Sequence, residues 1–101
     1  MTTREFLKKY KEHHKCIVCR EDDVNCLEFH HLNKKDKLFS LSHRLKSTID
    51  PKDVLREMNK TCLLCSNCHR KYHGGTLNVD DKFLEKNKVN VLISDYDQEI
   101  N

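Results

Sequence analysis

Four of the six cysteines in this 101-residue chain stand in two pairs whose spacing suits a zinc ion. Cys16-Ile-Val-Cys19 and Cys65-Ser-Asn-Cys68 each have the two-residue gap of a zinc knuckle, and two knuckles supply the four thiolates of a tetrahedral structural Zn²⁺ site. Cys62 and Cys65 form an overlapping pair, but Cys65 with Cys68 places the knuckle at the start of a histidine-bearing helix. We therefore predict that Cys16, Cys19, Cys65 and Cys68 hold a structural zinc ion.

Disulfide bonds are the alternative use of six cysteines, and they would suit a small secreted domain. Disulfides leave the nearby histidines unexplained, and Met1 to Arg20 contains no apolar signal-peptide core. Zinc in a reducing compartment fits better and predicts a cytoplasmic location. Cys26 and Cys62, which lie outside the two pairs, are then expected to be small buried residues on two strands.

Four histidines stand where they could build a second, open metal site. His69 and His73 are four residues apart, so a helix places both imidazoles on one face. His30 and His31 are adjacent at the end of an expected strand and point in different directions, so one can hold a metal while the other faces a substrate. An ion held by few imidazoles keeps an open position for a further ligand. The alternative is a second structural zinc site, or histidines that only pack.

Short helices and strands must position these residues. Phe6, Leu7 and Tyr10 recur at helical spacing, and Asp50-Pro51 is typical of a helix N-cap followed by the first helical residue. Gly74-Gly75 should end the histidine-bearing helix. We expect helices at residues 3–14, 50–60, 66–73 and 80–86, strands at 26–32, 61–64 and 89–93, and a frayed end over the last seven residues.

The composition predicts one small domain and leaves two explanations open for its positive charge. Only 37% of the residues are hydrophobic, so a metal staple is expected, and the chain has no long apolar span for a membrane. Residues 1–75 carry 16 Lys and Arg against 10 Asp and Glu, whereas residues 76–101 carry three against six. This basic body is consistent with a polyanion partner such as nucleic acid, and a solvated surface is the equal alternative. The candidate contacts to phosphate are Lys34, Lys35, Lys37 and Arg70, and a solvated loop is the alternative for the three lysines.

Three segments of the chain resemble the HNH endonucleases of the zinc-knuckle branch, which carry the ββα-metal motif. They are Leu27-Glu-Phe-His-His, then Lys37-Leu-Phe-Ser, and then the run from Lys60 through Cys65-Ser-Asn-Cys68-His-Arg. The resemblance is to small HNH proteins of phages and bacteria, and it covers residues 16 to 73. It implies a small α+β, zinc-stabilised, treble-clef-like domain at 16–75, with an N-terminal helix in 1–15 and an acidic extension at 76–101. It also implies the cytoplasm of a bacterial or phage-infected cell.

The resemblance also implies a function, namely metal-dependent cleavage of DNA. By this likeness His30, His69 and His73 hold a catalytic divalent metal, which is Mg²⁺, Mn²⁺, Ni²⁺ or Zn²⁺, and His31 is the general base. The asparagine of the family, which orients the base, falls nearest to Asn59. The alternative is a non-catalytic zinc module that binds nucleic acid or protein. The sequence leaves open whether the protein is a monomer or a homodimer.

Overall fold

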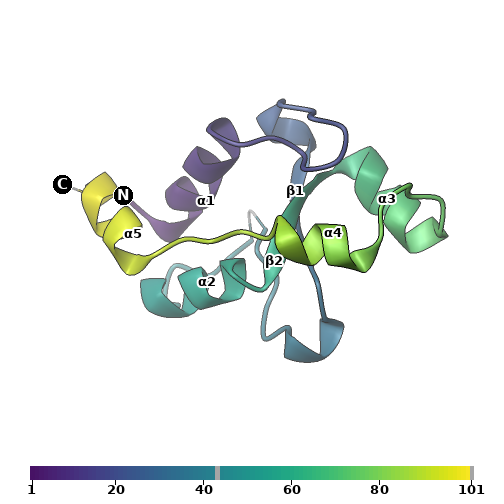
Figure 1. The fold of residues 1–101 in the computed structure, drawn as a ribbon. Coiled ribbons are helices and arrows are strands. Elements are labelled where there is room, and N and C mark those ends of the chain that lie inside the picture. The colour runs from purple at the N-terminus through teal and green to yellow at the C-terminus, as the bar shows by residue number, and fades with distance from the viewer. Residues whose placement is uncertain (43, 101) are drawn as a thin grey trace.

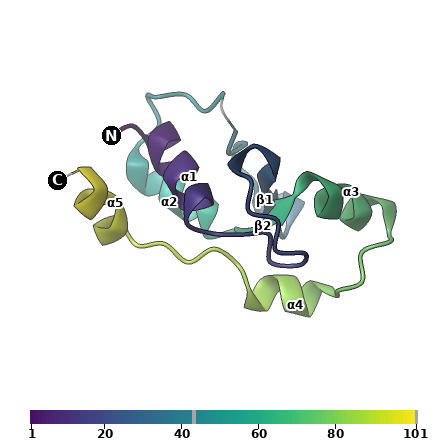
Figure 2. The same ribbon diagram turned by 90° about the horizontal axis from the view of Figure 1, so that it is seen from above.

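The computed structural model describes residues 1–42 and 44–100 as a small compact α+β fold (Figure 1). His43, for which the sequence predicts a structural or surface role, lies outside the described residues, as does Asn101. Strands β1 (Leu27–His31) and β2 (Thr61–Cys65) form a two-stranded antiparallel sheet. Helices α1 and α2 lie on one side of the sheet and α3 on the other in both ribbon views (Figures 1 and 2).

The register of the sheet decides which residues face each other. Leu27 pairs with Cys65, His30 with Cys62 and His31 with Thr61. Because neighbouring strand residues point to opposite faces, His30 and His31 leave β1 in opposite directions, as the sequence predicts. Helix α3 (Ser66–Gly74) begins directly after β2, so the second cysteine knuckle forms the junction between strand and helix.

Local capping signals fix the ends of three helices, of which the start at Asp50-Pro51 and the end at Gly74-Gly75 were predicted. Thr2 and Glu5 form a capping box at the start of α1 (Thr3–Glu12). The Asp50 side chain accepts a hydrogen bond from the Lys52 backbone NH at the start of α2 (Pro51–Met58). Gly75 ends α3 with a φ of 78°, which favours glycine because it has no Cβ.

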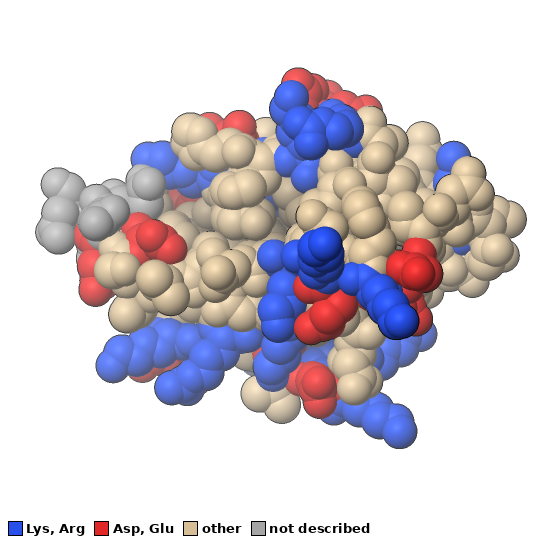
Figure 3. Space-filling model, viewed as in Figure 1, with Lys and Arg blue, Asp and Glu red and all other residues tan. Residues whose placement is uncertain are grey.

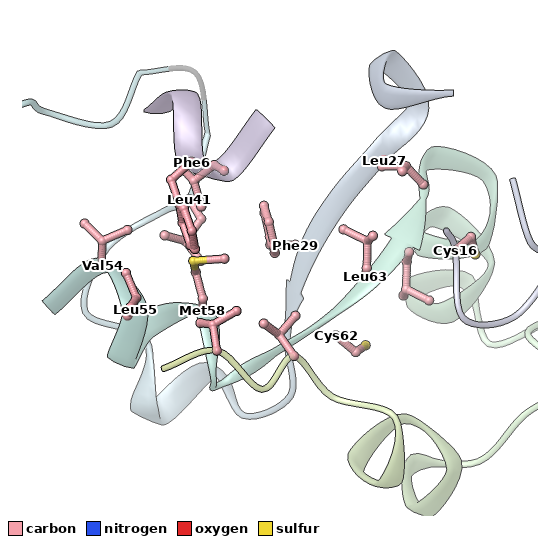
Figure 4. Packing of buried hydrophobic residues seen from close by; sticks show 14 of the residues in the cluster. Phe6, Cys16, Leu27, Phe29, Leu41, Val54, Leu55, Met58, Cys62 and Leu63 are labelled. Carbon is pink, nitrogen blue, oxygen red and sulfur yellow. The ribbon is translucent and has the colours of Figure 1, made fainter. Parts of the chain in front are cut away.

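The buried residues join α1 and α2 to the sheet. Phe6, Leu41, Val54 and Met58 pack together, and Phe29 of β1 lies between them and Leu63 of β2 (Figure 4). The apolar face predicted at Phe6, Leu7 and Tyr10 is therefore confirmed. Short 3₁₀ turns, η1 (Val24–Cys26) and η2 (Lys34–Asp36), flank β1.

The C-terminal segment differs from the sequence-based expectation. The helix α4 (Asp81–Lys86) is confirmed, but the strand expected at 89–93 is wrong, because residues 89–92 have no regular secondary structure and Ile93 begins a helix. Only one backbone hydrogen bond, from Val89 NH to Thr61 O at 2.8 Å, ties this stretch to β2 among the described residues.

The frayed C-terminus is also wrong, since Ile93–Ile100 forms helix α5 beside the N-terminus (Figures 1 and 2). Tyr96 is buried, its ring lies 5.3 Å from that of Phe6, and its hydroxyl donates to the Met1 carbonyl at 3.0 Å. Leu84, Val89 and Val91 are buried as well, so residues 76–101 contribute to the core. No helix in the described part of the chain is long and apolar enough to cross a bilayer.

Candidate metal centres

The four predicted cysteines come together as one cluster. Cys16 and Cys19 lie on the loop after α1, Cys65 ends β2, and Cys68 lies in the first turn of α3. Their Sγ atoms all lie within 4.8 Å of one another, and Cys19 Sγ is 3.5 Å from Cys65 Sγ. Tetrahedral zinc with Zn–S bonds of about 2.3 Å places its sulfur ligands about 3.8 Å apart. The cluster therefore fits one zinc ion.

Backbone hydrogen bonds hold the first knuckle in place against the sheet. Cys16 NH donates to Glu21 O at 2.9 Å, Arg20 NH donates to Cys16 O at 3.0 Å, and Arg20 adopts a left-handed φ of 70°. Ile17 NH donates to Leu63 O at 3.1 Å, which ties the loop to β2. These bonds bring a segment of the N-terminal third beside the end of β2.

The chemistry of the four thiols favours a bound cation. Burial raises the pKa of Cys16, but the backbone NH groups of Cys19, Cys65 and Val18 outweigh this effect and lower it to about 7. Burial and the neighbouring thiols raise the pKa of Cys68 well above its usual value. Four thiolates this close repel each other, so they can all ionise only around a positive ion.

The three predicted histidine ligands form a second cluster. His30 projects from β1, His69 and His73 project from α3, and their ligand nitrogens all lie within 4.8 Å. His30 Nδ1 is 3.2 Å from His69 Nε2. Metal–nitrogen bonds of about 2.05 Å in tetrahedral geometry separate two ligands by about 3.3 Å, so the spacing suits an ion.

A carboxylate outside the cluster fixes the ring of His69. His69 Nδ1 donates to Glu28 Oε1 at 2.7 Å, which leaves Nε2 with the lone pair that faces His30. The Ser66 hydroxyl donates to the other oxygen of Glu28 at 3.3 Å. Glu28 is two residues before His30 and so shares its face of β1, which is the sequence signal that would have found it.

His30 itself is in a state that suits ligation. Burial, followed by the charges of His69 and His73, lowers the pKa of His30 to about 4, so the imidazole is neutral at pH 7. Its Nε2 atom is buried without a hydrogen-bond partner among the described residues, and its ring packs 4.4 Å from that of Tyr72. A purely structural buried histidine normally bonds a carbonyl or carboxylate. Both clusters could thus hold a metal ion, and both are compatible with zinc.

His31 lies on the other face of β1 and bonds Glu57, a residue that the sequence analysis missed. His31 Nε2 donates to Glu57 Oε2 at 2.8 Å, and both side chains are buried. Glu57 also accepts from Leu38 NH and Lys60 Nζ, each at 2.9 Å. Burial raises the pKa of Glu57, but these donors outweigh it and lower the pKa below its usual value. Glu57 follows Val54 by three residues, and a carboxylate on that apolar face was the available signal.

Asn59 does not take the place expected for it. Its side-chain NH₂ donates to Val91 O at 2.9 Å, and its side-chain oxygen accepts from Val91 NH at 2.8 Å. Both polar atoms of the Asn59 side chain therefore bond Val91 of the C-terminal segment, and His31 donates to Glu57 and not to Asn59. The physical reason is that Asn59 follows the last residue of α2, where its side chain lies next to Val91 in the connection between α4 and α5.

A cleft of about 790 Å³ connects the two kinds of histidine. Its lining includes His31 and His69, together with Lys8 and Lys11 of α1 and Lys37. Of the four residues predicted to contact phosphate, Lys37 lines this cleft, whereas Lys34, Lys35 and Arg70 are exposed elsewhere on the surface. Lys11 is half-buried, and its Nζ lies 5.3 Å from the Phe29 ring.

Comparison of the chain with protein-family models, curated proteins and solved structures found no match. The fold and the two clusters define a small α+β domain with two groups of side chains that could bind metal ions.

Proposed function

We propose that this protein is a metal-dependent DNA endonuclease of the HNH type. The observation that supports the proposal most is the cleft shared by His31 and His69. His31 lies outside the histidine cluster and bonds the buried carboxylate of Glu57. The same cleft is lined by His69, which belongs to the cluster, and by several lysines.

His31 is the proposed general base. Because its Nε2–H donates to the ionised Glu57, the lone pair of the neutral ring lies on Nδ1. Nδ1 can take a proton from a water molecule as the water oxygen attacks phosphorus. The carboxylate of Glu57 then stabilises the imidazolium that forms. As the bond to the bridging oxygen breaks, this oxygen leaves, and the products by resemblance are a 5′-phosphate and a 3′-hydroxyl.

His30, His69 and His73 are the proposed ligands of the catalytic metal. A divalent ion bound there would supply stabilisation of the negative charge on the phosphate oxygens and on the leaving oxygen. Glu28 orients His69 for this purpose. Lys8, Lys11 and Lys37 add positive charge along the cleft, where they would attract the DNA backbone.

The four cysteines are the proposed structural zinc site. They join the loop after α1 to the junction of β2 and α3, and α3 carries two of the three histidine ligands. The zinc ion would therefore set the position of the catalytic centre without taking part in the reaction.

A non-catalytic zinc module is the second candidate. The pair of His31 and Glu57 favours this candidate, because it joins β1 to α2 and a buried pair of this kind can have a purely structural role. On this reading the cleft binds nucleic acid, and the histidine cluster is a second structural site.

Cleavage of supercoiled plasmid separates the two candidates. The wild type is incubated with magnesium, manganese, nickel or zinc in turn, beside His31→Ala and His31→Gln prepared in the same way. The Gln variant retains an NH donor for Glu57 but has no basic nitrogen. We expect nicked or linear DNA from the wild type and a loss of about 10²–10⁴-fold in both variants. Intact DNA under every metal, with retardation on a gel, would instead support the binding module.

A further inference from the structure

We propose that a second, positively charged pocket binds a phosphate of the nucleic-acid backbone, at a site separate from the histidine cleft. Three segments form this pocket, which we call the α1–α4 pocket: the end of α1, the first cysteine knuckle and the stretch from the end of α4 to Asn90. Its volume is about 610 Å³, which suits one nucleotide unit. It shares no lining residue with the histidine cleft.

The exposed charged side chains that line the α1–α4 pocket all have one sign, while the thiol of Cys16, which also lines it, is buried. Lys15, Arg20, Lys86 and Lys88 line it and are exposed, and no carboxylate is among the described residues that line it. Glu85 pairs with Lys88 at 3.3 Å, but both side chains are about half exposed, so water screens this pair strongly. Figure 3 shows Lys and Arg side chains over α4 and near the connection from α1 to β1, with Asp and Glu side chains beside both groups. Cations gathered from three segments repel each other unless an anion lies between them.

The walls that carry these cations are anchored to the core. Arg20 is held in its left-handed conformation by the knuckle, where its NH donates to Cys16 O. Val89, which directly follows Lys88, is buried, and its NH donates to Thr61 O of β2. Leu84 of α4 is also buried, so the segment that carries Lys86 and Lys88 is attached to the core. The positive charges therefore start from fixed backbone positions, which lowers the entropy cost of binding an anion.

An aromatic platform at the rim favours a nucleic-acid strand over a bare anion. The imidazole of His14 stacks on Tyr10 with ring centroids 3.8 Å apart, and its Nδ1 donates to Tyr10 O at 2.7 Å. His14 is exposed, so the outer side of the stack is available to a base or sugar. Helix α1 lines the α1–α4 pocket through Tyr10 and the histidine cleft through Lys8 and Lys11. A nucleic-acid strand that crosses α1 can therefore contact both sites.

The test measures the salt dependence of binding to a short fluorescent DNA duplex. The full chain carries His31→Gln so that no cleavage intervenes, and Lys86→Ala with Lys88→Ala is added to it. The matched control is Lys46→Ala with Lys52→Ala, which removes the same charge from exposed positions outside both hollows. We expect the slope of log affinity against log salt, between about 50 and 200 mM, to fall by about 2 for the pocket variant. The control should change it by less than half as much.

Equal slopes for the pocket variant and the control would overturn the proposal. A titration with a mononucleotide and with inorganic phosphate, followed by NMR chemical shifts of Arg20 and His14, identifies the ligand class. Shifts with these small ligands but an unchanged duplex slope would assign the pocket to a small phosphorylated molecule and overturn the assignment to a strand. The outcome does not depend on cleavage, because the duplex is bound by a variant that lacks His31.

Discussion

Replacement of Glu57 tests the pair that connects the proposed base to the fold. The side chain of Glu57 is 1% exposed and accepts from His31, Leu38 and Lys60. Glu57→Leu would leave the His31 Nε2–H and the Leu38 NH without an acceptor, at about 1–3 kcal/mol each. We therefore expect the free energy of unfolding to fall by about 2–6 kcal/mol, which is the sum of the costs of these two unpaired donors.

Glu57→Gln should cost less, because one amide oxygen can replace Oε2, which accepts from both His31 and Leu38. Only the bond from Lys60 is lost, and Lys60 is 30% exposed and also donates to Asp36 O. Water can solvate the freed ammonium group, so the expected loss in the free energy of unfolding is about 1.5 kcal/mol.

Urea unfolding followed by circular dichroism measures these differences. Asp53→Asn on the same helix is the control, since Asp53 pairs with Arg56 at 3.0 Å and both side chains are more than half exposed. Its loss should stay below about 1 kcal/mol. A Glu57→Leu protein that loses no more stability than Asp53→Asn would refute the reasoning about this buried pair. In the plasmid assay the rate should fall most for Glu57→Leu, toward the 10²–10⁴-fold loss of a general base, and less for Glu57→Gln.

Two further replacements test the structural roles of single residues. Cys65→Ser should bind no zinc and should unfold, because structural zinc sites contribute about 10–16 kcal/mol of binding free energy and small domains have less net stability than that. Metal analysis and circular dichroism measure this effect. Cys26→Ser, which lies outside the cluster, is the control and should stay folded. Asn59→Ala should lower the free energy of unfolding by about 1–3 kcal/mol, since two hydrogen bonds to Val91 are lost. Thermal melting measures this loss, and the exposed Asn67→Ala is the control, with little expected change. A Cys65→Ser protein that melts cooperatively like the wild type, or an Asn59→Ala protein as stable as Asn67→Ala, would contradict these roles.

The resemblance and the spacing predicted the two clusters that the fold brings together. The cysteine pairs and the histidines of α3 are short-range patterns, in which a gap of two or four residues determines whether two side chains can share an ion. The caps at Thr2, Asp50 and Gly75 act within one helical turn, so α1, α2 and α3 were predictable within a few residues. The roles of His31 and of the proposed nuclease centre stay predictions until the plasmid assay is done.

Only the tertiary structure decided which distant groups meet. Glu57 bonds His31 across 26 residues and Asn59 bonds Val91 across 32, while the Tyr96 hydroxyl reaches Met1 across 95. Periodicity and propensity describe neighbours within a few residues, whereas these contacts depend on how α2, the 89–93 segment and α5 dock on the rest of the chain. The sequence alone therefore determined the ligand types and the local elements, and the docking of segments determined the partner of His31, the use of Asn59 and the burial of Tyr96 in the C-terminal helix.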